Sequence, residues 1–424
     1  MKIKHQSFAR FVMLVIVLIT TSCSQGAKPS GSISFMIFGE PAELQAYHTL
    51  VDAFQGEHPE ISVEVIEVPN QGDYRKRVAA DLAAGSPADI VLINYRRFTE
   101  LAAKNAFEPL GPYLDKSELI KVGDFYDLPL QAFSMGNNVV CIPQNISSLA
   151  MYYNKDLFDA AGLAYPNNDW TWNDFITAAQ ALTLDTDQDG QVDQYGAGVE
   201  PELIRVAPFV WQNGGNISDE SRLLLTDPPA LEAIQWFVDW QVKYHIVPDA
   251  AGEESESSEN RFINGRTAMY FNSRRVVPTF REITAFDWDV ATLPAGDREG
   301  TILHSDAYCL TAASKNKDAA WTFIEYANAV EGQTIIAGTG RTVPSLIQVA
   351  ESEAYLEPGS KPENSRAFLD AIDTMYRLPQ QANWAEIEEI CSEELARAFY
   401  GNATVKEAML SAYDRTLPLF TEIE

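Results

Sequence analysis

Hydrophobic positions in the first hundred residues alternate between the period of a strand and that of a helix. Residues 33–38 are apolar except for Ser34 and predict a buried strand, and residues 42–55 repeat apolar side chains at helical spacing. Apolar and polar residues alternate over residues 61–66, which predicts a second strand. A helix is expected over residues 73–84 and a fully buried strand over residues 89–93. This order of elements predicts an open α/β lobe with a mostly parallel sheet.

The loops that follow two of these strands are candidate binding loops, because ligands of open α/β sheets bind beyond the carboxyl ends of the strands. Glu40 follows the first strand and Asn94 follows the third. Both residue types are also common in turns and caps, so the pattern leaves a binding role and a structural role open for each.

After residue 138 the pattern changes. Short apolar strands are predicted at residues 139–142 and 149–153, on either side of a polar turn, and such a pair suits a crossing between two lobes. Helices are predicted over residues 172–182, 230–243 and 318–330. The second half of the chain is therefore expected to contain further α/β structure.

Length and charge narrow the class of protein. A chain of 424 residues with 46% hydrophobic content exceeds the size at which one core stops growing, so two lobes are expected. The formal charge of -29 excludes a nucleic-acid partner, because phosphate backbones are bound by clustered Lys and Arg. The acidic run at residues 252–260 is interpreted as a solvated loop.

The N-terminus has the pattern of a targeting signal. A basic start precedes an apolar stretch, residues 11–19, that is too short to span a bilayer. Small residues then precede Cys23, and this arrangement resembles a bacterial lipobox, in which the cysteine becomes the lipid-modified first residue. We expect residues 1–22 to be a lipoprotein signal peptide and residues 23–31 a tether.

Three further cysteines, Cys141, Cys309 and Cys391, follow Cys23. Their number is odd, and their spacing is not that of a zinc or redox motif. We expect three buried thiols, with one disulfide and one free thiol as the alternative.

Six short motifs follow one another along the chain, at residues 74–90, 152–163, 170–175, 262–269, 314–321 and 340–344. In this order they resemble the family 1 extracellular solute-binding proteins, the group that includes maltose-binding protein and many carbohydrate importer receptors. The resemblance extends almost from end to end.

This resemblance implies the two-lobed, type II periplasmic-binding-protein fold, in which crossing strands join two discontinuous α/β lobes. Residues 32–143 and 304–343 would form the N-terminal lobe, and residues 144–303 and 344–424 the C-terminal lobe. A ligand would lie in the cleft, and closure of the lobes around it would mark the loaded receptor for an importer.

The function implied by the resemblance is capture of a sugar or oligosaccharide outside the cytoplasm. A monomer, lipid-anchored at Cys23, would deliver its ligand to the transmembrane subunits of an ABC importer, with no catalysis and no required cofactor. Whether the partner is a transporter or a sensor is left open.

A sugar site requires aromatic platforms together with planar carboxylate, amide or guanidinium partners. Tyr153 is favoured over Trp172, which is expected to be structural. By the resemblance, the candidate ligand contacts are Glu40, Asn94, Tyr153, Trp211, Asn213, Tyr270, Asn272, Asp306, Arg341 and Trp384.

A possible calcium loop lies at residues 185–193. Oxygen ligands occupy loop positions 1, 3, 5 and 9, and a glycine supplies the turn. Position 12 is Gly196 instead of the usual bidentate Glu, so an acidic turn without metal is the alternative. The candidate ligands are Asp185, Asp187, Asp189 and Asp193.

Two rival functions remain. An enzyme is disfavoured, because the sequence has no GxSxG, HExxH, Walker A or GxGxxG motif and its histidines are dispersed. The same receptor fold with a non-sugar ligand, such as a polyol phosphate or a peptide, would use arginines to clamp an anion. Clustered arginines in the cleft would favour this alternative, and the candidates are Arg205, Arg274, Arg275 and Arg341.

Overall fold

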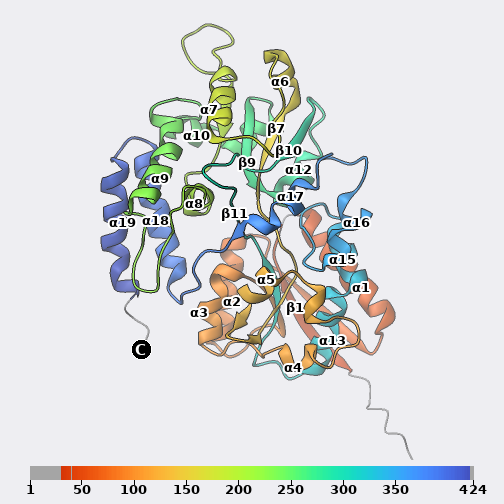
Figure 1. The fold of residues 1–424 in the computed structure, drawn as a ribbon. Helices are drawn as coiled ribbons and strands as arrows, with labels where there is room; N and C mark the ends of the chain where they lie inside the picture. Colours follow the sequence, from red (N-terminus) through yellow and green to blue (C-terminus); the bar gives the residue numbers. More distant parts are fainter. Residues whose placement is uncertain (1–29, 40, 421–424) are drawn as a thin grey trace, which may run out of the picture.

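The computed structural model describes residues 30–39 and 41–420 (Figure 1). The predicted signal peptide, Cys23 and the candidate contact Glu40 lie outside the described residues. No helix in the described part of the chain is long and apolar enough to cross a membrane.

The first lobe is built on a five-stranded sheet with the order β2-β1-β3-β12-β6. β1 pairs in parallel with β2 and β3, whereas β12 is antiparallel to both β3 and β6. The three strands predicted near the N-terminus are therefore present. Their neighbour β12 comes from a segment more than 200 residues later. The strands are β1 (Gly31–Ile37), β2 (Ile61–Glu67), β3 (Ile90–Asn94), β6 (Ile142–Pro143) and β12 (Asp306–Leu310).

Helices flank this sheet, and local sequence explains where they begin. The Asn70 side chain caps α2 by accepting the backbone N–H of Asp73, and Tyr74 and Val78 form the buried face of that helix. β4 (Ser134–Met135) and β5 (Asn138–Val139) form a small antiparallel hairpin. The helices are α1 (Pro41–Glu57), α2 (Gln71–Ala83), α3 (Tyr95–Ala103), α4 (Gly111–Leu114), η1 (Val122–Asp124), α5 (Asp127–Ala132), α13 (Lys317–Asn328) and α14 (Val330–Ala337).

The second lobe contains a four-stranded sheet with the order β10-β7-β9-β8. β7 is antiparallel to β9 and β10, and only β8 runs parallel to its neighbour β9. In each sheet one strand, β12 in the first and β7 in the second, runs against all the others, because a strand that returns from a crossing enters in the opposite direction. The remaining strands run in the same direction, as the expected mostly parallel arrangement requires. The strands are β7 (Leu149–Asn154), β8 (Tyr195–Gly198), β9 (Thr267–Ser273) and β10 (Trp288–Ala291).

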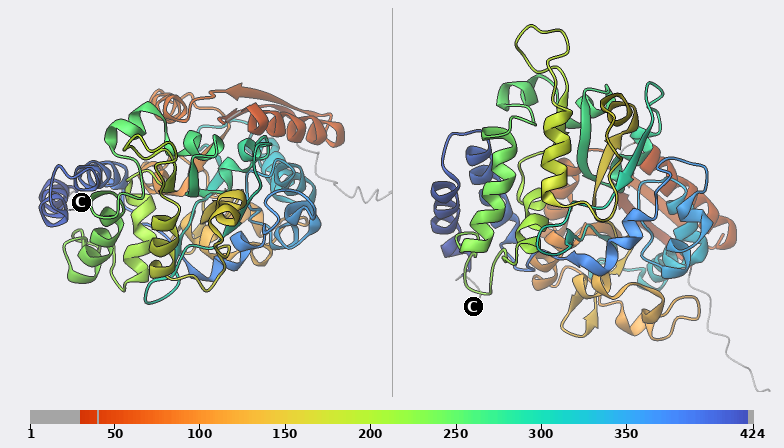
Figure 2. Two further views of the ribbon diagram at one scale, coloured as in Figure 1. Left: turned by 90° about the horizontal axis from the view of Figure 1, so that it is seen from above. Right: turned by 45° about the horizontal axis from the view of Figure 1, so that its top comes forward.

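Helices cover this second sheet, and α18 and α19 pack on α9 at one edge of the molecule (Figure 2). A short pair of parallel strands, β11 (Thr301–Ile302) and β13 (Met375–Tyr376), lies near α8. The helices up to residue 280 are α6 (Lys155–Ala161), α7 (Trp172–Ala181), α8 (Leu203–Gln212), α9 (Pro228–Val242), α10 (Ala250–Ser255), α11 (Ser258–Ile263), η2 (Arg274–Val276) and α12 (Val277–Phe280).

The last part of the chain divides between two neighbourhoods. α15 and α16 pack against α14 of the first lobe, whereas α18 packs against α8, α9 and α19. The lobe boundaries inferred from the resemblance stay a prediction. The helices are α15 (Ile347–Ala350), α16 (Glu353–Leu356), α17 (Ala367–Asp370), η3 (Ile372–Thr374), α18 (Trp384–Phe399) and α19 (Val405–Phe420).

The acidic run expected to be a solvated loop instead forms most of α10 and the first half of α11. Asp249 caps α10 and Ser257 caps α11, each by accepting a backbone N–H. The buried Arg261 side chain donates to the carbonyl of Gly252 and lies within 3.6 Å of the Glu253 carboxylate. An arginine among the carboxylates offsets the repulsion that would keep such a run extended.

The expectation of three buried thiols is wrong for Cys141 and Cys309. They form a disulfide with a Cα–Cα distance of 4.6 Å, while Cys391 is a free, buried thiol. The reason is the pairing of β6 with β12. Tyr308 lies opposite Ile142, so continuing this antiparallel register by one residue places the two cysteines directly opposite each other.

Candidate functional site

A cavity of about 1420 Å³ lies between the two lobes. Residues of α2, β3 and α3 line it from the first lobe, and residues of α8, β9 and α18 line it from the second. The chain passes between the lobes beside it. We call this space the interlobe cavity. Its volume exceeds the 300–1,000 Å³ typical of small-molecule sites, so it has room for a ligand larger than one small ring.

Three crossing segments, residues 144–147, 304–306 and 342–345, form the floor of the interlobe cavity. Ser147 and His304 exchange both backbone hydrogen bonds, each 2.8 Å long. On the other side of the first segment, the backbone N–H of residue 146 donates to the carbonyl of residue 343 at 2.9 Å. The three segments therefore form a small antiparallel unit with the first segment in the middle.

The side chains on one face of this unit point into the cavity, because alternate residues of an extended segment share a face. This explains why every second residue lines the cavity, with Ile146 and Ser305 between them buried on the other side. The lining residues of the floor are Asn145, Ser147, His304, Asp306 and Thr342.

Asp306 connects the floor to the end of β3. Its Oδ1 accepts a hydrogen bond from Asn94 Nδ2 at 3.1 Å, and its backbone N–H donates to Asn145 Oδ1 at 2.9 Å. Burial raises the pKa of Asp306, and the Asn94 hydrogen bond and the charges of Arg341 and Arg96 oppose that rise. Two predicted contacts, Asn94 and Asp306, therefore meet at the cavity.

His304 is held beside Asp306 in an environment of positive charge. Burial lowers its pKa well below the ordinary value, and the guanidinium groups of Arg96, Arg205 and Arg275 lower it further. The imidazole is therefore neutral at physiological pH. Its Nε2 is buried and has no hydrogen-bond partner among the described residues.

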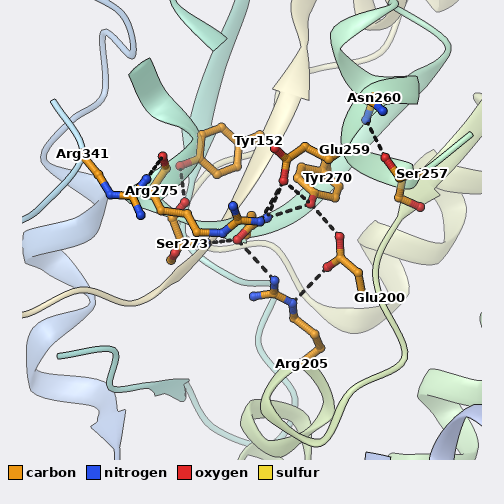
Figure 3. A network of polar contacts seen from close by, with 12 residues as sticks. Tyr152, Glu200, Arg205, Ser257, Glu259, Asn260, Tyr270, Ser273, Arg275 and Arg341 are labelled. Carbon is orange, nitrogen blue, oxygen red and sulfur yellow. Dashed lines mark hydrogen bonds and ion pairs between the residues drawn. The ribbon is translucent and has the colours of Figure 1, made fainter. Parts of the chain in front are cut away.

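Behind the floor lies a polar network that orients Arg205 (Figure 3). Arg205 Nε lies 3.1 Å from Glu200 Oε2, and its Nη2 donates to Asn272 Oδ1 at 3.3 Å. Tyr270 Oη donates to Glu200 Oε1 at 2.7 Å and accepts from Asn272 Nδ2 at 2.7 Å. Asn272 and Arg205 line the cavity, whereas Tyr270 supports them from below.

Arginines are the most frequent basic residues of the cavity wall. Arg341 Nε pairs with Glu43 Oε2 at 2.8 Å, and Arg275 Nη2 pairs with Glu259 Oε2 at 2.8 Å. Arg274, a sequence-based candidate, is instead buried with its guanidinium 4.4 Å from the centre of the Tyr355 ring. The arginines that line the cavity are Arg75, Arg96, Arg97, Arg205, Arg275 and Arg341.

An ion pair in the wall of the cavity joins the two lobes. Arg96 of α3 bonds to the carboxylate of Glu388 on α18, and Arg97 lies 3.9 Å from the same carboxylate. The side chains of Arg96 and Glu388 are 10% and 12% exposed. We call this contact the edge ion pair. It joins α3 of the first lobe to α18 of the second.

Several residues predicted to contact the ligand do not line the cavity. Tyr153 packs against Phe158 and Tyr165, and Trp211 stacks on Tyr376 with ring centroids 5.1 Å apart. Asn213 and Trp384 also lie elsewhere. Asn213, at the C-terminal end of α8, donates to the backbone carbonyl of Pro229. Trp384 is fully buried at the start of α18. These placements are those of packing and capping residues.

The cavity also lacks the aromatic platforms expected of a sugar site. All eight tryptophans belong to the described residues, and none of them lines the cavity. The aromatic lining residues are Phe38 and Tyr74, and the Tyr74 hydroxyl already donates to the backbone carbonyl of Leu92 at 2.9 Å. Recognition in this conformation must rely on polar groups.

Sequence reasoning missed Ser147, His304 and Thr342, all of which line the floor. The polar turn between the two short strands after residue 138 was recognised as a crossing, but its side chains were not considered as contacts. A polar residue at every second position of a crossing segment is the pattern that would have identified them.

Three of the four predicted calcium ligands come together in the structure. Carboxylate oxygens of Asp185, Asp187 and Asp193 lie within 4.8 Å of one another, without Asp189. Backbone N–H groups of the same loop already donate to these oxygens, for example Gly190 N to Asp185 Oδ2 at 2.9 Å. The calcium loop stays a prediction.

Comparison with known proteins relates this architecture to a single functional class. The model of the bacterial extracellular solute-binding proteins matches residues 39–334. The sn-glycerol-3-phosphate-binding periplasmic protein of Escherichia coli strain K12 is 23% identical over 403 residues, covering 89% of each chain.

Two solved structures share the fold. An ABC substrate-binding protein from Listeria monocytogenes in complex with cycloalternan has a TM-score of 0.85 and 23% identity, over 93% of this chain and 100% of the other. The UgpB protein of Mycobacterium tuberculosis in complex with glycerophosphocholine has a TM-score of 0.80 and 20% identity, over 92% of this chain and 98% of the other.

Proposed function

Because the chain belongs to the bacterial extracellular solute-binding protein family, we propose that it captures a sugar or oligosaccharide in the interlobe cavity and delivers it to an ABC importer. The observation that carries this proposal is the cavity itself, about 1420 Å³ in volume and lined by both lobes. A ligand that contacts both lobes at once stabilises the closed arrangement, and that arrangement is what a membrane partner can distinguish from the empty receptor.

The chemistry of the cavity wall supports a hydroxylated ligand. Sugar hydroxyls both donate and accept hydrogen bonds, and Asn94, Asn272 and Asp306 offer amide and carboxylate groups suited to them. The cycloalternan complex of the Listeria protein shows that this fold accommodates an oligosaccharide. The glycerol-3-phosphate-binding relative shows that related chains also serve phosphorylated polyols.

The family assignment implies an extracytoplasmic location. We propose that Cys23 carries the lipid that tethers the protein to the membrane, on the basis of the lipobox-like residues before it. Metabolic labelling with a palmitate analogue tests this directly: the label is expected on the intact protein and is expected to disappear with Cys23→Ala.

The proposed binding function is tested by a thermal-shift screen of residues 24–424 with mono- and oligosaccharides, followed by small-angle scattering. A ligand that binds only the native state raises the unfolding temperature in a saturable way. Closure of the lobes should also reduce the radius of gyration. A screen in which no hydroxylated ligand stabilises the protein would contradict the proposal.

A further inference from the structure

Three polar atoms on the floor of the interlobe cavity have no hydrogen-bond partner among the described residues: Ser147 Oγ, His304 Nε2 and Thr342 Oγ1. Ser147 and Thr342 are only 6% and 7% exposed. A buried polar atom without a partner is destabilising, so a group that supplies the missing hydrogen bonds gains affinity in return. The floor is thus incomplete without a ligand.

The backbone register brings these three side chains into a row. Ser147 and His304 form a directly opposed antiparallel pair, so their side chains lie on the same face. On the other side, Asn145 is paired with Pro344, and the same register two residues further along sets Thr342 opposite Ser147. Ser147 therefore has His304 on one side and Thr342 on the other.

Three arginines act on this row, and each is paired with a carboxylate. The guanidinium groups that act on His304 are those of Arg96, Arg205 and Arg275, which approach from α3, α8 and η2 and pair with Glu388, Glu200 and Glu259. The nearest acid along the chain is Asp306, which faces the same cavity and already accepts a hydrogen bond from Asn94. A guanidinium has five N–H donors, so each of these arginines keeps N–H groups beyond those that its carboxylate uses, and these can donate to a ligand oxygen.

Two hydroxyls and an imidazole N–H can all donate hydrogen bonds to oxygen. Donors to an anionic oxygen form stronger bonds than donors to a neutral one, and arginines nearby add to the preference. We propose that Ser147, His304 and Thr342 form a subsite for an anionic oxygen group of the solute, a phosphate or a carboxylate on a hydroxylated carbon skeleton. This inference rests on the proposed function, because it specifies the captured carbohydrate as an acidic one.

The test is isothermal titration of residues 24–424 with matched neutral and charged probes. The neutral probes are glucose, maltotriose and glycerol, and the charged ones are glucose 6-phosphate, glucuronate and glycerol 3-phosphate, with inorganic phosphate alone as a further arm. The subsite predicts that a charged probe binds at least about tenfold more tightly than its neutral counterpart. Comparison of the phosphate and carboxylate arms identifies which anion the subsite takes.

Two variants test the assignment of residues. Ser147→Ala and Thr342→Val are each expected to weaken binding of the charged probe about ten- to hundredfold and to weaken binding of the neutral probe by a clearly smaller factor, because a hydrogen bond to a charged oxygen is the stronger one. Ser148→Ala and Thr267→Val are matched controls, since both hydroxyls are also buried and unpartnered but neither residue lines the cavity. The controls are expected to bind like the unaltered protein.

The outcomes separate this inference from the proposed function. A neutral sugar that binds as tightly as its charged counterpart, unaffected by Ser147→Ala and Thr342→Val, overturns the anion subsite and leaves the sugar receptor intact. Binding of inorganic phosphate with no preference among the organic probes also overturns it. The absence of binding by any probe overturns both proposals.

Discussion

The floor and the edge of the interlobe cavity are both polar, but they differ in how their polar groups are satisfied. At the edge, Arg96 and Glu388 already pair with each other across the lobes. On the floor, Ser147, His304 and Thr342 present atoms that have no partner among the described residues. The edge therefore stabilises a closed arrangement by itself, whereas the floor gains its full stability only when a ligand completes its hydrogen bonds.

The largest expected effect concerns the disulfide that fixes the floor. Cys141 and Cys309 precede and follow two of the crossing segments, and the bond closes a loop with a sequence separation of 168. Replacing both cysteines with alanine should lower the free energy of unfolding by about 4–5 kcal/mol, because the unfolded chain gains freedom. Urea denaturation measures this loss.

Reductant provides the control for the disulfide prediction. Treatment of the unaltered protein with reductant under denaturing conditions should reproduce the lower stability of the double variant. The stability of the Cys391→Ala variant should still be lowered by reductant, because Cys391 is a free thiol and the disulfide remains in this variant. Equal stability of the oxidised protein and the double variant would contradict the prediction, because it would mean that the bond does not restrict the unfolded chain.

The next effect comes from the buried arginine behind the floor. Arg205→Met removes the ionic partner of Glu200 and one of the two donors to Asn272 Oδ1, so unfolding should become easier by about 3 kcal/mol. Arg222→Met is the exposed comparison and should cost less than about 0.5 kcal/mol. Chemical denaturation measures the loss of stability in both variants. Equal losses would mean that the floor does not depend on this network.

A smaller effect is the pH dependence contributed by His304. Because its pKa is lowered in the folded state, the unfolded chain binds the proton more readily, and stability is lost as pH falls below about 6.5. The free energy of unfolding then falls by up to about 1.4 kcal/mol for each pH unit below 6.5, and the contribution of His304 is fully present above that pH. His304→Gln should remove it.

The measured quantity is the difference between the unaltered protein and His304→Gln from pH 7.5 to pH 5. Asp306 acts in the opposite direction, since its raised pKa means that stability falls as pH rises through its titration, and the difference between the two proteins cancels this contribution. Parallel pH profiles of the two proteins would show that His304 is not buried in a neutral form.

The smallest effect is expected at the edge. Glu388→Gln removes the charge that Arg96 meets across the lobes and should weaken ligand binding by about 1 kcal/mol, mainly through faster dissociation. Stopped-flow kinetics at low and high salt measure this change. Glu389→Gln is the matched control, because Glu389 lines the same cavity and forms no ion pair with any described residue within 4 Å. If Glu389→Gln sped up dissociation as much as Glu388→Gln, the effect would come from the net charge of the cavity wall and not from the edge ion pair.

Hydrophobic periodicity predicted the elements of the first lobe well. The runs at residues 33–38, 61–66 and 89–93 correspond to β1, β2 and β3, because one face or both faces of each strand are buried. The arrival of β12 beside β3 was beyond such reasoning, since the periodicity of a strand does not reveal which distant strand it pairs with. For the same reason the disulfide was only the alternative to three buried thiols, and the structure has this alternative.

The candidate site was predicted in part. Asn94, Asn272, Asp306 and Arg341 line the cavity, because strand ends and crossings lead there. The aromatic candidates lie in the core or behind the cavity wall, as Trp211 does on Tyr376. Burial of a large aromatic side chain stabilises the fold, and a sequence motif does not show whether the ring is buried or faces a ligand. Which residues of a crossing face the ligand depends on register, and the register became visible only in the structure.

The central claim is that the solute lies on the floor formed by the crossing segments, and a crystal structure with the tightest-binding probe tests it most directly. The account predicts an oxygen of the ligand within hydrogen-bond distance of Ser147, His304 and Thr342, with the edge ion pair closed over it. A ligand stacked between Tyr153 and Trp211, or bound outside the interlobe cavity, would contradict it.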